Sequence, residues 1–346
     1  MFNKDAQYFI EPLLKAKEVD SLILFRNNSP EIKSDLWLQK GEGVYNDNRF
    51  KFLSRLSGIL RQKKISVFIG IYEIPHGLIA LIVAIIKQKP SIVSIIGNPK
   101  YSIRNNGFRG VVTNWIYKRA SILTVTGNQS KKFLVEHKGI VENKIYVLPN
   151  SIPVDEFIND KNQLAPKKYD LVTIGRLSSE KGLLNLIGII AILRKQTPKI
   201  RLGIAGKGPQ MEELKEKVQE HNLEENIDLL GYVESASEFL RNGKIFISTS
   251  YTEGLPRTAI QSMLGGLPVV ASNVGDMSDL VINEKTGVLI EDPNDKMSFV
   301  NGINMILNDD SKFNIFSENA INYAKKYYSH KAATKVWNDV FSDLKI

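Results

Sequence analysis

The sequence predicts an α/β protein of two domains, each built on an open parallel β-sheet with helices on both faces. Three observations support this prediction. Short runs rich in Val and Ile alternate with amphipathic stretches along the whole chain, which is the pattern of βαβ units. A length of 346 residues suits two domains of ordinary size. A segment with three prolines and little periodicity, 149–166, divides the chain near its middle.

Residues 1–155 are expected to form the amino-terminal domain. Its strands should be short, apolar and buried on both faces, and they are predicted at 21–25, 67–71, 91–96, 122–125 and 145–148. Apolar residues at helical spacing predict helices at 49–63, 76–87 and 114–119.

Residues 167–325 are expected to form the carboxy-terminal domain, after a linker at 156–166. Strands of the same kind are predicted at 169–174, 201–205, 227–229, 245–248, 269–271 and 287–290. Helices are predicted at 181–194, 210–221 and 258–264, and 326–346 should form a helix that returns to the amino-terminal domain. Because open α/β sheets bind ligands beyond the carboxyl ends of their strands, a cleft between the two domains is the expected site.

The composition excludes several classes of protein. With no cysteine, the chain cannot carry a disulfide scaffold, a thiolate nucleophile, a zinc finger or an iron–sulfur cluster. Its four histidines lie far apart in sequence, so we expect no metal site. The longest apolar run, 78–86, has nine residues, well short of the ~20 that span a bilayer. The opening residues do not resemble a signal peptide, so a cytoplasmic location is expected.

The positive charge is concentrated in the amino-terminal half. The net charge is +9, and residues 49–132 hold fifteen Lys and Arg but one acidic residue, Glu73. Such a bias fits a solvated basic surface, nucleic-acid binding or attraction to an anionic membrane leaflet. No RNP-like aromatic motif or heptad-linked basic region accompanies it. The membrane surface is therefore favoured over nucleic acid.

The first motif follows the strand predicted at 169–174. Residues 175–182 read G-R-L-S-S-E-K-G and lead into a helix. Arg176 and Lys181 would stand near the positive end of that helix, an arrangement that suits a diphosphate. An ordinary βα loop with surface charges is the alternative. A second, weaker motif, A-G-K-G-P at 205–209, could bring the backbone close to a ligand or simply form a turn.

The third motif is S-T-S-Y-T-E-G-L-P at 248–256. Pro256 is expected to be the first residue of a helix whose free N–H groups point at the strand ends. Glu253 lies just before that helix and can accept hydrogen bonds from hydroxyl groups. Gln261, about two turns along, can reach the same pocket. Alternatively, Glu253 only caps the helix and Gln261 is an exposed amide.

In order, the motifs G-R-L-x-x-E-K-G, A-G-x-G-P, E-G-L-P and G-x-P-V-V-A between 169 and 292 resemble those of the retaining family 4 glycosyltransferases, or glycosyl transferases group 1. The resemblance implies a GT-B fold of two facing Rossmann-like domains, the amino-terminal one for the acceptor. It implies that Arg176 and Lys181 hold a donor diphosphate and Glu253 contacts the donor sugar. The implied donor-binding residues are Gly175, Gly206, Gly208, Gly254, Leu255, Pro256 and Gln261.

The amino-terminal half matches the family more loosely. The segments I-P-H-G-L-I-A at 74–80 and I-G-N at 96–98 resemble parts of its acceptor domain, which implicates His76, Gly97 and Asn98. The chain departs from the family at Gln261, where a glutamate is usual, and at 97–98, where many members have a histidine. We also expect it to lack the family's first strand, because it begins on what resembles the following helix.

The resemblance implies a retaining hexosyltransferase that moves a sugar from a nucleotide-sugar to a hydroxyl group. With no D-x-D motif in a suitable loop, neither a metal nor another cofactor is expected, and a UDP-sugar is favoured over a GDP-sugar. The expected acceptor is a glycan, carried on a lipid at the inner face of the membrane, in bacterial surface polysaccharide or lipopolysaccharide synthesis. Two alternatives remain. One is a non-catalytic GT-B-like subunit that partners an active transferase, suggested by Gln261 and by the expected lack of the first strand; the other is a sugar-nucleotide epimerase.

Overall fold

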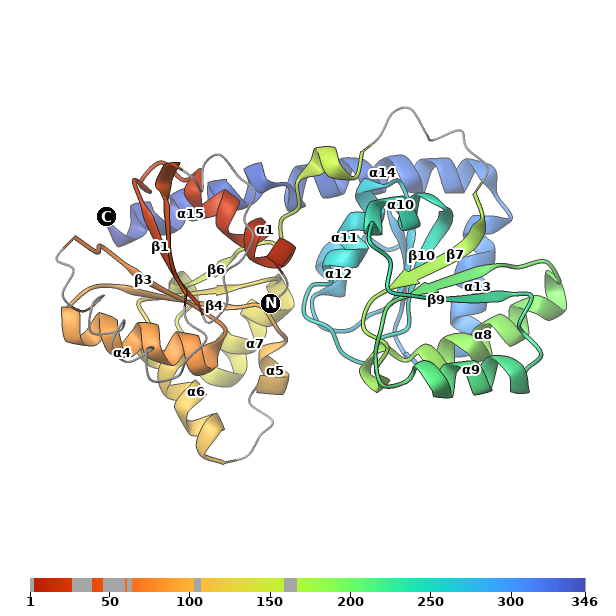
Figure 1. Cartoon of the computed structure of the whole chain (residues 1–346), viewed down its shortest axis with the longest axis horizontal. Helices are drawn as coiled ribbons and strands as arrows, with labels where there is room; N and C mark the ends of the chain where they lie inside the picture. The colour runs from red at the N-terminus through yellow and green to blue at the C-terminus, as the bar shows by residue number, and fades with distance from the viewer. Residues whose placement is uncertain are drawn as a thin grey trace. The chain divides into compact units, whose positions relative to one another are not determined.

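The computed structural model describes residues 3–26, 39–45, 60, 64–102, 107–158 and 167–345. The chain divides into two compact units, Met1–Ser151 with Tyr328–Ile346, and Ile152–Tyr327. Each unit is built on its own parallel sheet (Figure 1). The break at Ile152 lies slightly before the predicted linker at 156–166, of which 159–166 fall outside the described residues.

The main sheet of the first unit has four parallel strands in the order β3-β4-β5-β6. These are β3 (Phe68–Ile71), β4 (Ser91–Ile95), β5 (Ile122–Val125) and β6 (Ile145–Val147), all close to their predicted positions. β4 and β5 are fully buried, which explains their continuous apolar sequence.

A separate two-stranded parallel sheet pairs β1 (Leu22–Arg26) with β2 (Gly41–Tyr45). The sequence predicts β1 but not β2, because the two glycines of G-E-G-V-Y give a weak strand signal. Most of the helix predicted at 49–63 lies outside the described residues, so it stays a prediction, as does the missing first strand.

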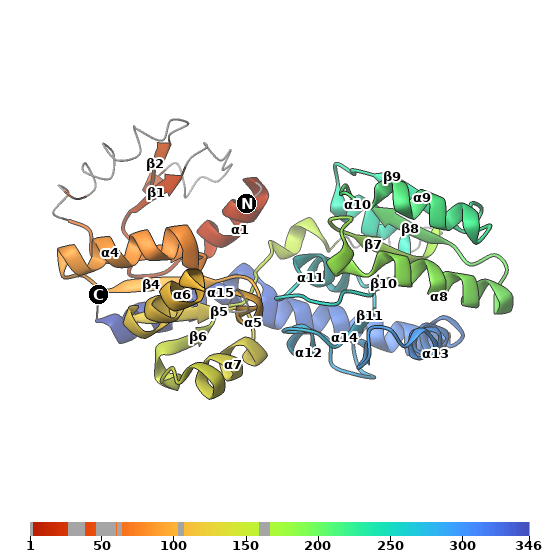
Figure 2. The ribbon, with the colours of Figure 1, turned by 90° about the horizontal axis from the view of Figure 1, so that it is seen from below.

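Helices cover both faces of the four-stranded sheet (Figures 1 and 2). One face carries α4 (Leu78–Lys87), α6 (Phe108–Arg119) and α7 (Asn128–Lys138), each of which connects two adjacent strands. The other face carries α1 (Asn3–Leu14) and α15 (His330–Leu344), which pack on each other around the buried Trp337. The helix predicted from 76 starts only at Leu78, because Glu73–Gly77 form a separate turn.

The sheet of the second unit has six parallel strands in the order β12-β11-β10-β7-β8-β9. They are β7 (Tyr169–Ile174), β8 (Leu202–Ala205), β9 (Ile227–Gly231), β10 (Gly243–Ser248), β11 (Val269–Ser272) and β12 (Gly287–Ile290). The sequence predicts each of them to within about two residues. Two units with parallel sheets and helices on both faces confirm the predicted α/β class.

The helices of the second unit lie on two faces (Figure 1). One face carries α8 (Leu183–Gln196), α9 (Met211–Glu220) and α13 (Lys296–Leu307), which share one large apolar core. The other carries α10 (Ala236–Arg241), α11 (Arg257–Leu264) and α12 (Met277–Leu280). A long helix, α14 (Asp310–Tyr328), follows α13.

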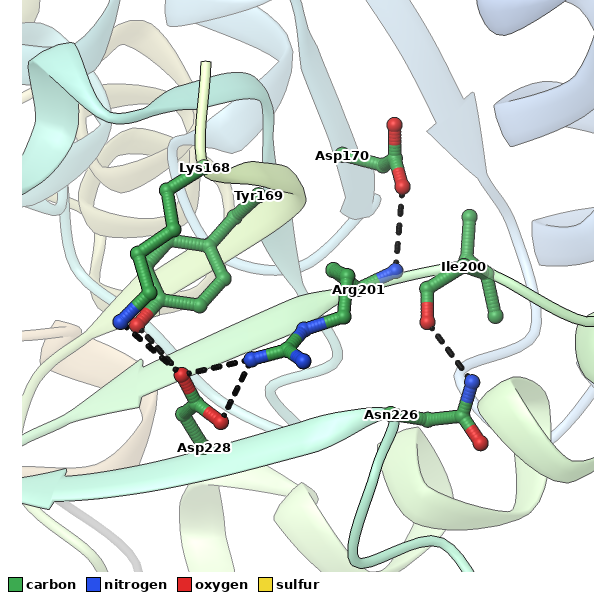
Figure 3. A network of polar contacts seen from close by, with 7 residues as sticks. All are labelled: Lys168, Tyr169, Asp170, Ile200, Arg201, Asn226 and Asp228. Carbon is green, nitrogen blue, oxygen red and sulfur yellow. Dashed lines mark hydrogen bonds and ion pairs between the residues drawn. The ribbon is translucent and has the colours of Figure 1, made fainter.

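A polar network joins the amino ends of β7, β8 and β9 (Figure 3). Asp228 accepts two hydrogen bonds from Nη2 of Arg201, at 2.8 and 2.9 Å, and one of 2.7 Å from the hydroxyl of Tyr169. Lys168 lies 3.2 Å from the same carboxylate, and Asp170 accepts from the backbone N–H of Arg201. Because ligands bind at the carboxyl ends of such strands, we assign this network to stability.

Candidate functional site

The strand order of the second unit reverses between β7 and β10. From β7 the chain moves outward through β8 and β9, and from β10 it moves the other way through β11 and β12. At such a point, neighbouring loops diverge to opposite faces and leave room for a ligand beyond the carboxyl ends of the strands. The two loops here are 175–182, the β7 loop, and 249–256, the β10 loop. They carry two of the three predicted motifs.

Lys181 of the β7 loop and Glu253 of the β10 loop meet at this point. The ammonium nitrogen of Lys181 lies 2.6 Å from Oε1 of Glu253, and the hydroxyl of Ser250 donates to the same oxygen at 2.7 Å. Only 10% of the Glu253 side chain is exposed, and 27% of that of Lys181. The structure thus brings together a cation and a carboxylate that the sequence predicts for one site.

The two loops are locked to each other through Gly182. Its φ of +62° is a conformation that favours glycine, and a Cβ there would lie 2.1 Å from the carbonyl oxygen of Thr249. The hydroxyl of Thr249 donates a 3.0 Å hydrogen bond to the carbonyl oxygen of Gly182. The backbone N–H of Tyr251 donates one of 2.9 Å to the carbonyl oxygen of Glu180. This close approach fixes the separation of Lys181 and Glu253.

Arg176 lies exposed at the start of the β7 loop. The pKa of Glu180 lies below its usual value because of the neighbouring Ser178 side chain and, to a smaller extent, the charges of Arg176 and Lys181. A joint action of Arg176 and Lys181 on one anion stays a prediction of the sequence.

Gly206 and Gly208 have a role within the fold. A Cβ on Gly206 would lie 1.7 Å from the carbonyl oxygen of Gly175, and one on Gly208 would lie 2.1 Å from that of Leu177. Both glycines thus let the loop after β8 pack beneath the β7 loop. A Cβ on Gly175 would have no other atom within 4 Å, so space remains open at the end of β7.

The remaining predicted donor residues lie where the β10 loop enters α11. Pro256 is not the first helical residue but the one before it, since α11 begins at Arg257. Leu255 is buried. Gly254 accepts a hydrogen bond at its carbonyl from the N–H of Asp276, and Gln261 lies half-buried in the second turn of α11.

The predicted acceptor residues follow two adjacent strands of the first unit. His76 is exposed in the turn after β3, and its Nδ1 lies 3.2 Å from the carbonyl oxygen of Ile71. Gly97 and Asn98 follow β4, and Asn98 accepts a hydrogen bond from the N–H of Lys100. Because β3 and β4 are parallel neighbours, these residues share one edge of the sheet.

The sequence does not predict the two hydroxyl residues that hold site carboxylates, Tyr117 for Glu73 and Ser250 for Glu253. The hydroxyl of Tyr117, on α6, donates a 2.7 Å hydrogen bond to the buried Glu73 at the start of the turn that carries His76. Burial, together with the neighbouring Glu73 carboxylate, raises the pKa of Tyr117, so the phenol stays a donor. The only sequence signals were the lone acidic residue of a basic stretch and, for Ser250, a run of hydroxyl residues after a buried strand.

The described residues offer neither a metal site nor a membrane-spanning helix. No group of three or more His, Asp or Glu side chains there could hold a metal ion. No described helix is long and apolar enough to cross a membrane.

Comparisons with known proteins agree with this geometry. A family model described as glycosyl transferases group 1 matches residues 154–326, half of the chain. An uncharacterized glycosyltransferase of Methanocaldococcus jannaschii is 28% identical, over 79% of this chain and 70% of its own. The UDP-Gal:α-D-GlcNAc-diphosphoundecaprenol α-1,3-galactosyltransferase of Escherichia coli is 25% identical, over 79% of this chain and 74% of its own.

Solved structures show the same fold. The structure of HepE from Anabaena in complex with UDP matches with a TM-score of 0.81, at 18% identity, over 99% of this chain and 96% of its own. The likeness extends through both units and confirms the predicted GT-B fold of two Rossmann-like domains.

Proposed function

The chain belongs to the glycosyl transferases group 1 family, and from this premise we propose that it transfers a hexose from a nucleotide-sugar to a hydroxyl group with retention of configuration. The observation that carries the proposal is the meeting of Lys181 and Glu253 at the carboxyl ends of β7 and β10. A cation for the diphosphate and a carboxylate for sugar hydroxyls are the two groups that such a donor requires.

Each charged side chain has a distinct role in this proposal. Arg176 and Lys181 bind the diphosphate and stabilise the negative charge that grows on it as the bond to the sugar breaks. Glu253 accepts hydrogen bonds from sugar hydroxyls and holds the ring in place. The backbone amides of Gly254 and Leu255, before the amino terminus of α11, approach the phosphate and the sugar.

In the proposed reaction, the bond between the anomeric carbon and the diphosphate oxygen breaks, and a bond to the acceptor oxygen forms on the same face of the sugar. The proton of the acceptor hydroxyl passes to the departing phosphate oxygen. No side chain is therefore assigned as the general base. With two cations and a helix amino terminus at the diphosphate, a divalent metal is not required.

We propose a UDP-sugar as the donor and a lipid-linked glycan as the acceptor. The Anabaena relative was solved with UDP, and the name of the E. coli relative describes a UDP-galactose donor and a diphosphoundecaprenol-linked acceptor. His76, Gly97 and Asn98 would lie on the acceptor side. Such a reaction belongs to bacterial surface polysaccharide or lipopolysaccharide synthesis at the inner face of the membrane, where basic residues of the first unit favour anionic lipid.

The experiment that tests the proposal is a transfer assay with UDP-sugars and undecaprenyl-diphosphate-linked glycans, with and without Mg²⁺. We expect one donor to be consumed with formation of an α-linked product, and the reaction to continue without metal. Hydrolysis or epimerisation of a UDP-sugar without an acceptor would contradict the proposal. Donor binding without any transfer, in the presence of a partner transferase, would favour a non-catalytic subunit, which the amide at Gln261 already suggests.

A further inference from the structure

Two neighbouring helices of the first unit expose apolar side chains where surface helices are ordinarily polar. α4 and α6 lie side by side on the same face of the four-stranded sheet (Figures 1 and 2). Six large apolar side chains of these helices are exposed, and we call them together the apolar face: Ile82, Ile85, Ile86, Phe108, Val111 and Trp115.

The apolar face follows from the sequence of each helix. α4 reads L-I-A-L-I-V-A-I-I-K, so it has no polar side chain before Lys87. Its inward residues, such as Leu81, are buried in the core, while Ile86 is 63% exposed. In α6, Phe108, Val111 and Trp115 recur at helical spacing, and Phe108 is 84% exposed. Six large apolar side chains on adjacent helices make a patch of the kind that marks a binding surface.

The charged residues that the structure describes on α4 and α6 are all basic. Lys87 and Lys89 stand at the carboxyl end of α4, and Lys118 and Arg119 at that of α6. No Asp or Glu occurs anywhere between residues 74 and 135, which hold nine Lys and Arg. A protein partner would present a rim of mixed charge, whereas an anionic bilayer presents an apolar interior under a uniformly negative surface.

We propose that the apolar face of α4 and α6 docks on an anionic lipid bilayer, with the six side chains at the depth of the acyl chain boundary and the basic residues among the headgroups. The inference rests on the proposed transfer to a membrane-bound acceptor and assigns the surface by which the chain reaches it. α4 begins at Leu78, two residues after His76, so docking holds the predicted acceptor turn next to the membrane. Tyr72 and Ile74 of the same segment are also exposed.

The test is partition of the whole chain onto vesicles of phosphatidylcholine with about one third phosphatidylglycerol. The variant Ile86→Ser with Val111→Ser removes apolar area from both helices, and we expect it to lower partition at least roughly tenfold. The matched control, Met297→Ser with Ile315→Ser, changes two exposed apolar residues of the second unit and should bind as the unchanged protein does.

A second variant tests the charges. Lys118→Gln with Arg119→Gln should weaken binding to the anionic vesicles and reduce its dependence on salt, while leaving the weak binding to pure phosphatidylcholine unchanged. Thermal unfolding of each variant shows whether it is folded. Calorimetric binding of UDP-sugars without vesicles should be unaltered in all of them, which separates this inference from the proposed transferase site.

Three outcomes would overturn the inference. The unchanged protein could fail to bind the anionic vesicles, or the apolar variant could bind them as strongly as the control. The unchanged protein could also form dimers that the apolar variant disperses, which would assign the apolar face to a second copy of the chain instead of lipid.

Discussion

Lys181 and Glu253 are 72 residues apart in the chain, yet their side chains touch. The cause is the sheet order, which makes β7 and β10 neighbours and brings their carboxyl ends together. At the scale of the residue, the site is therefore a cation and a carboxylate held by two backbone loops. In the proposed function these two charges bind the donor, and Gly182 allows the loops to approach.

The first prediction concerns the cation. In Lys181→Ala the diphosphate loses a positive charge that stabilises its departure, so we expect kcat to fall by roughly 10² to 10³. The control is Lys199→Ala, which removes an exposed lysine of the same unit and should leave kcat unchanged. Steady-state kinetics with a saturating donor checks both. A Lys181→Ala enzyme as fast as the control would exclude this role.

The second prediction concerns the close approach of the loops. In Gly182→Ala the added Cβ would lie 2.1 Å from the Thr249 carbonyl oxygen, so the loops must separate. We expect the free energy of unfolding to fall by more than about 2 kcal/mol. Gly139→Ala is the matched control, because Gly139 has the same positive φ, +63°, but open space around it. The free energy of unfolding of Gly139→Ala should fall by only about 1 kcal/mol, the cost of placing an alanine at a positive φ. Equal losses in denaturant unfolding would show that the contact with Thr249 does not matter.

At the scale of the element, the candidate donor residues and the network around Asp228 lie at opposite ends of the sheet of the second unit. The loops after β7 and β10 carry the candidate donor residues, while Asp228 ties the opposite ends of β7, β8 and β9 together (Figure 3). In the first unit, Tyr117 on α6 holds Glu73 and with it the turn after β3.

The third prediction concerns pH. Burial would raise the pKa of Asp228, but hydrogen bonds from Tyr169 and Lys168 and the charge of Arg201 lower it overall. Because the pKa is lower in the folded than in the unfolded chain, the ionised carboxylate stabilises the fold. That contribution is complete above about pH 4 and is lost as the pH falls through the folded-state pKa.

Asp228→Asn should therefore reduce the free energy of unfolding at neutral pH by about 1–3 kcal/mol. The free energy of unfolding of this variant should also fall less steeply than that of the unchanged protein as the pH is lowered. Glu224→Gln, at an exposed carboxylate just before β9, is the control and should change neither. Denaturant titrations at several pH values measure both quantities. An unchanged acid decline in Asp228→Asn would show that Asp228 is not the group responsible.

The fourth prediction concerns the turn that carries His76. Tyr117→Phe leaves the buried Glu73 without its hydroxyl donor, and we expect a stability loss of about 1–3 kcal/mol. If the turn positions the acceptor, KM for the acceptor should rise while KM for the donor stays unchanged. A rise in both, or in neither, would mean that the pair acts on the fold alone.

The sequence predicts elements better than contacts, for physical reasons. Strands such as β4 and β5 are buried on both faces, so their apolar runs are conspicuous, whereas β2 is rich in glycine and gives no such signal. Lys181 and Glu253 stand in motifs, but the hydrogen bonds that Ser250 and Tyr117 make depend on chain segments that only the fold brings together.

At the scale of the whole molecule, two parallel-sheet units divide the proposed work. The second unit carries the charged groups that we propose for the donor, and the first carries the predicted acceptor turn and the apolar face. The central claim is that the second unit binds a nucleotide-sugar through Arg176, Lys181 and Glu253. That claim is independent of the acceptor, so it can be tested with the donor alone.

The most direct test is calorimetry of the whole chain with a panel of UDP- and GDP-sugars, with and without Mg²⁺. We predict that one UDP-sugar binds, that its affinity does not depend on the metal, and that Arg176→Ala abolishes binding while Lys199→Ala does not. Failure of every donor to bind a folded sample, or binding that Arg176→Ala leaves intact, would contradict the account.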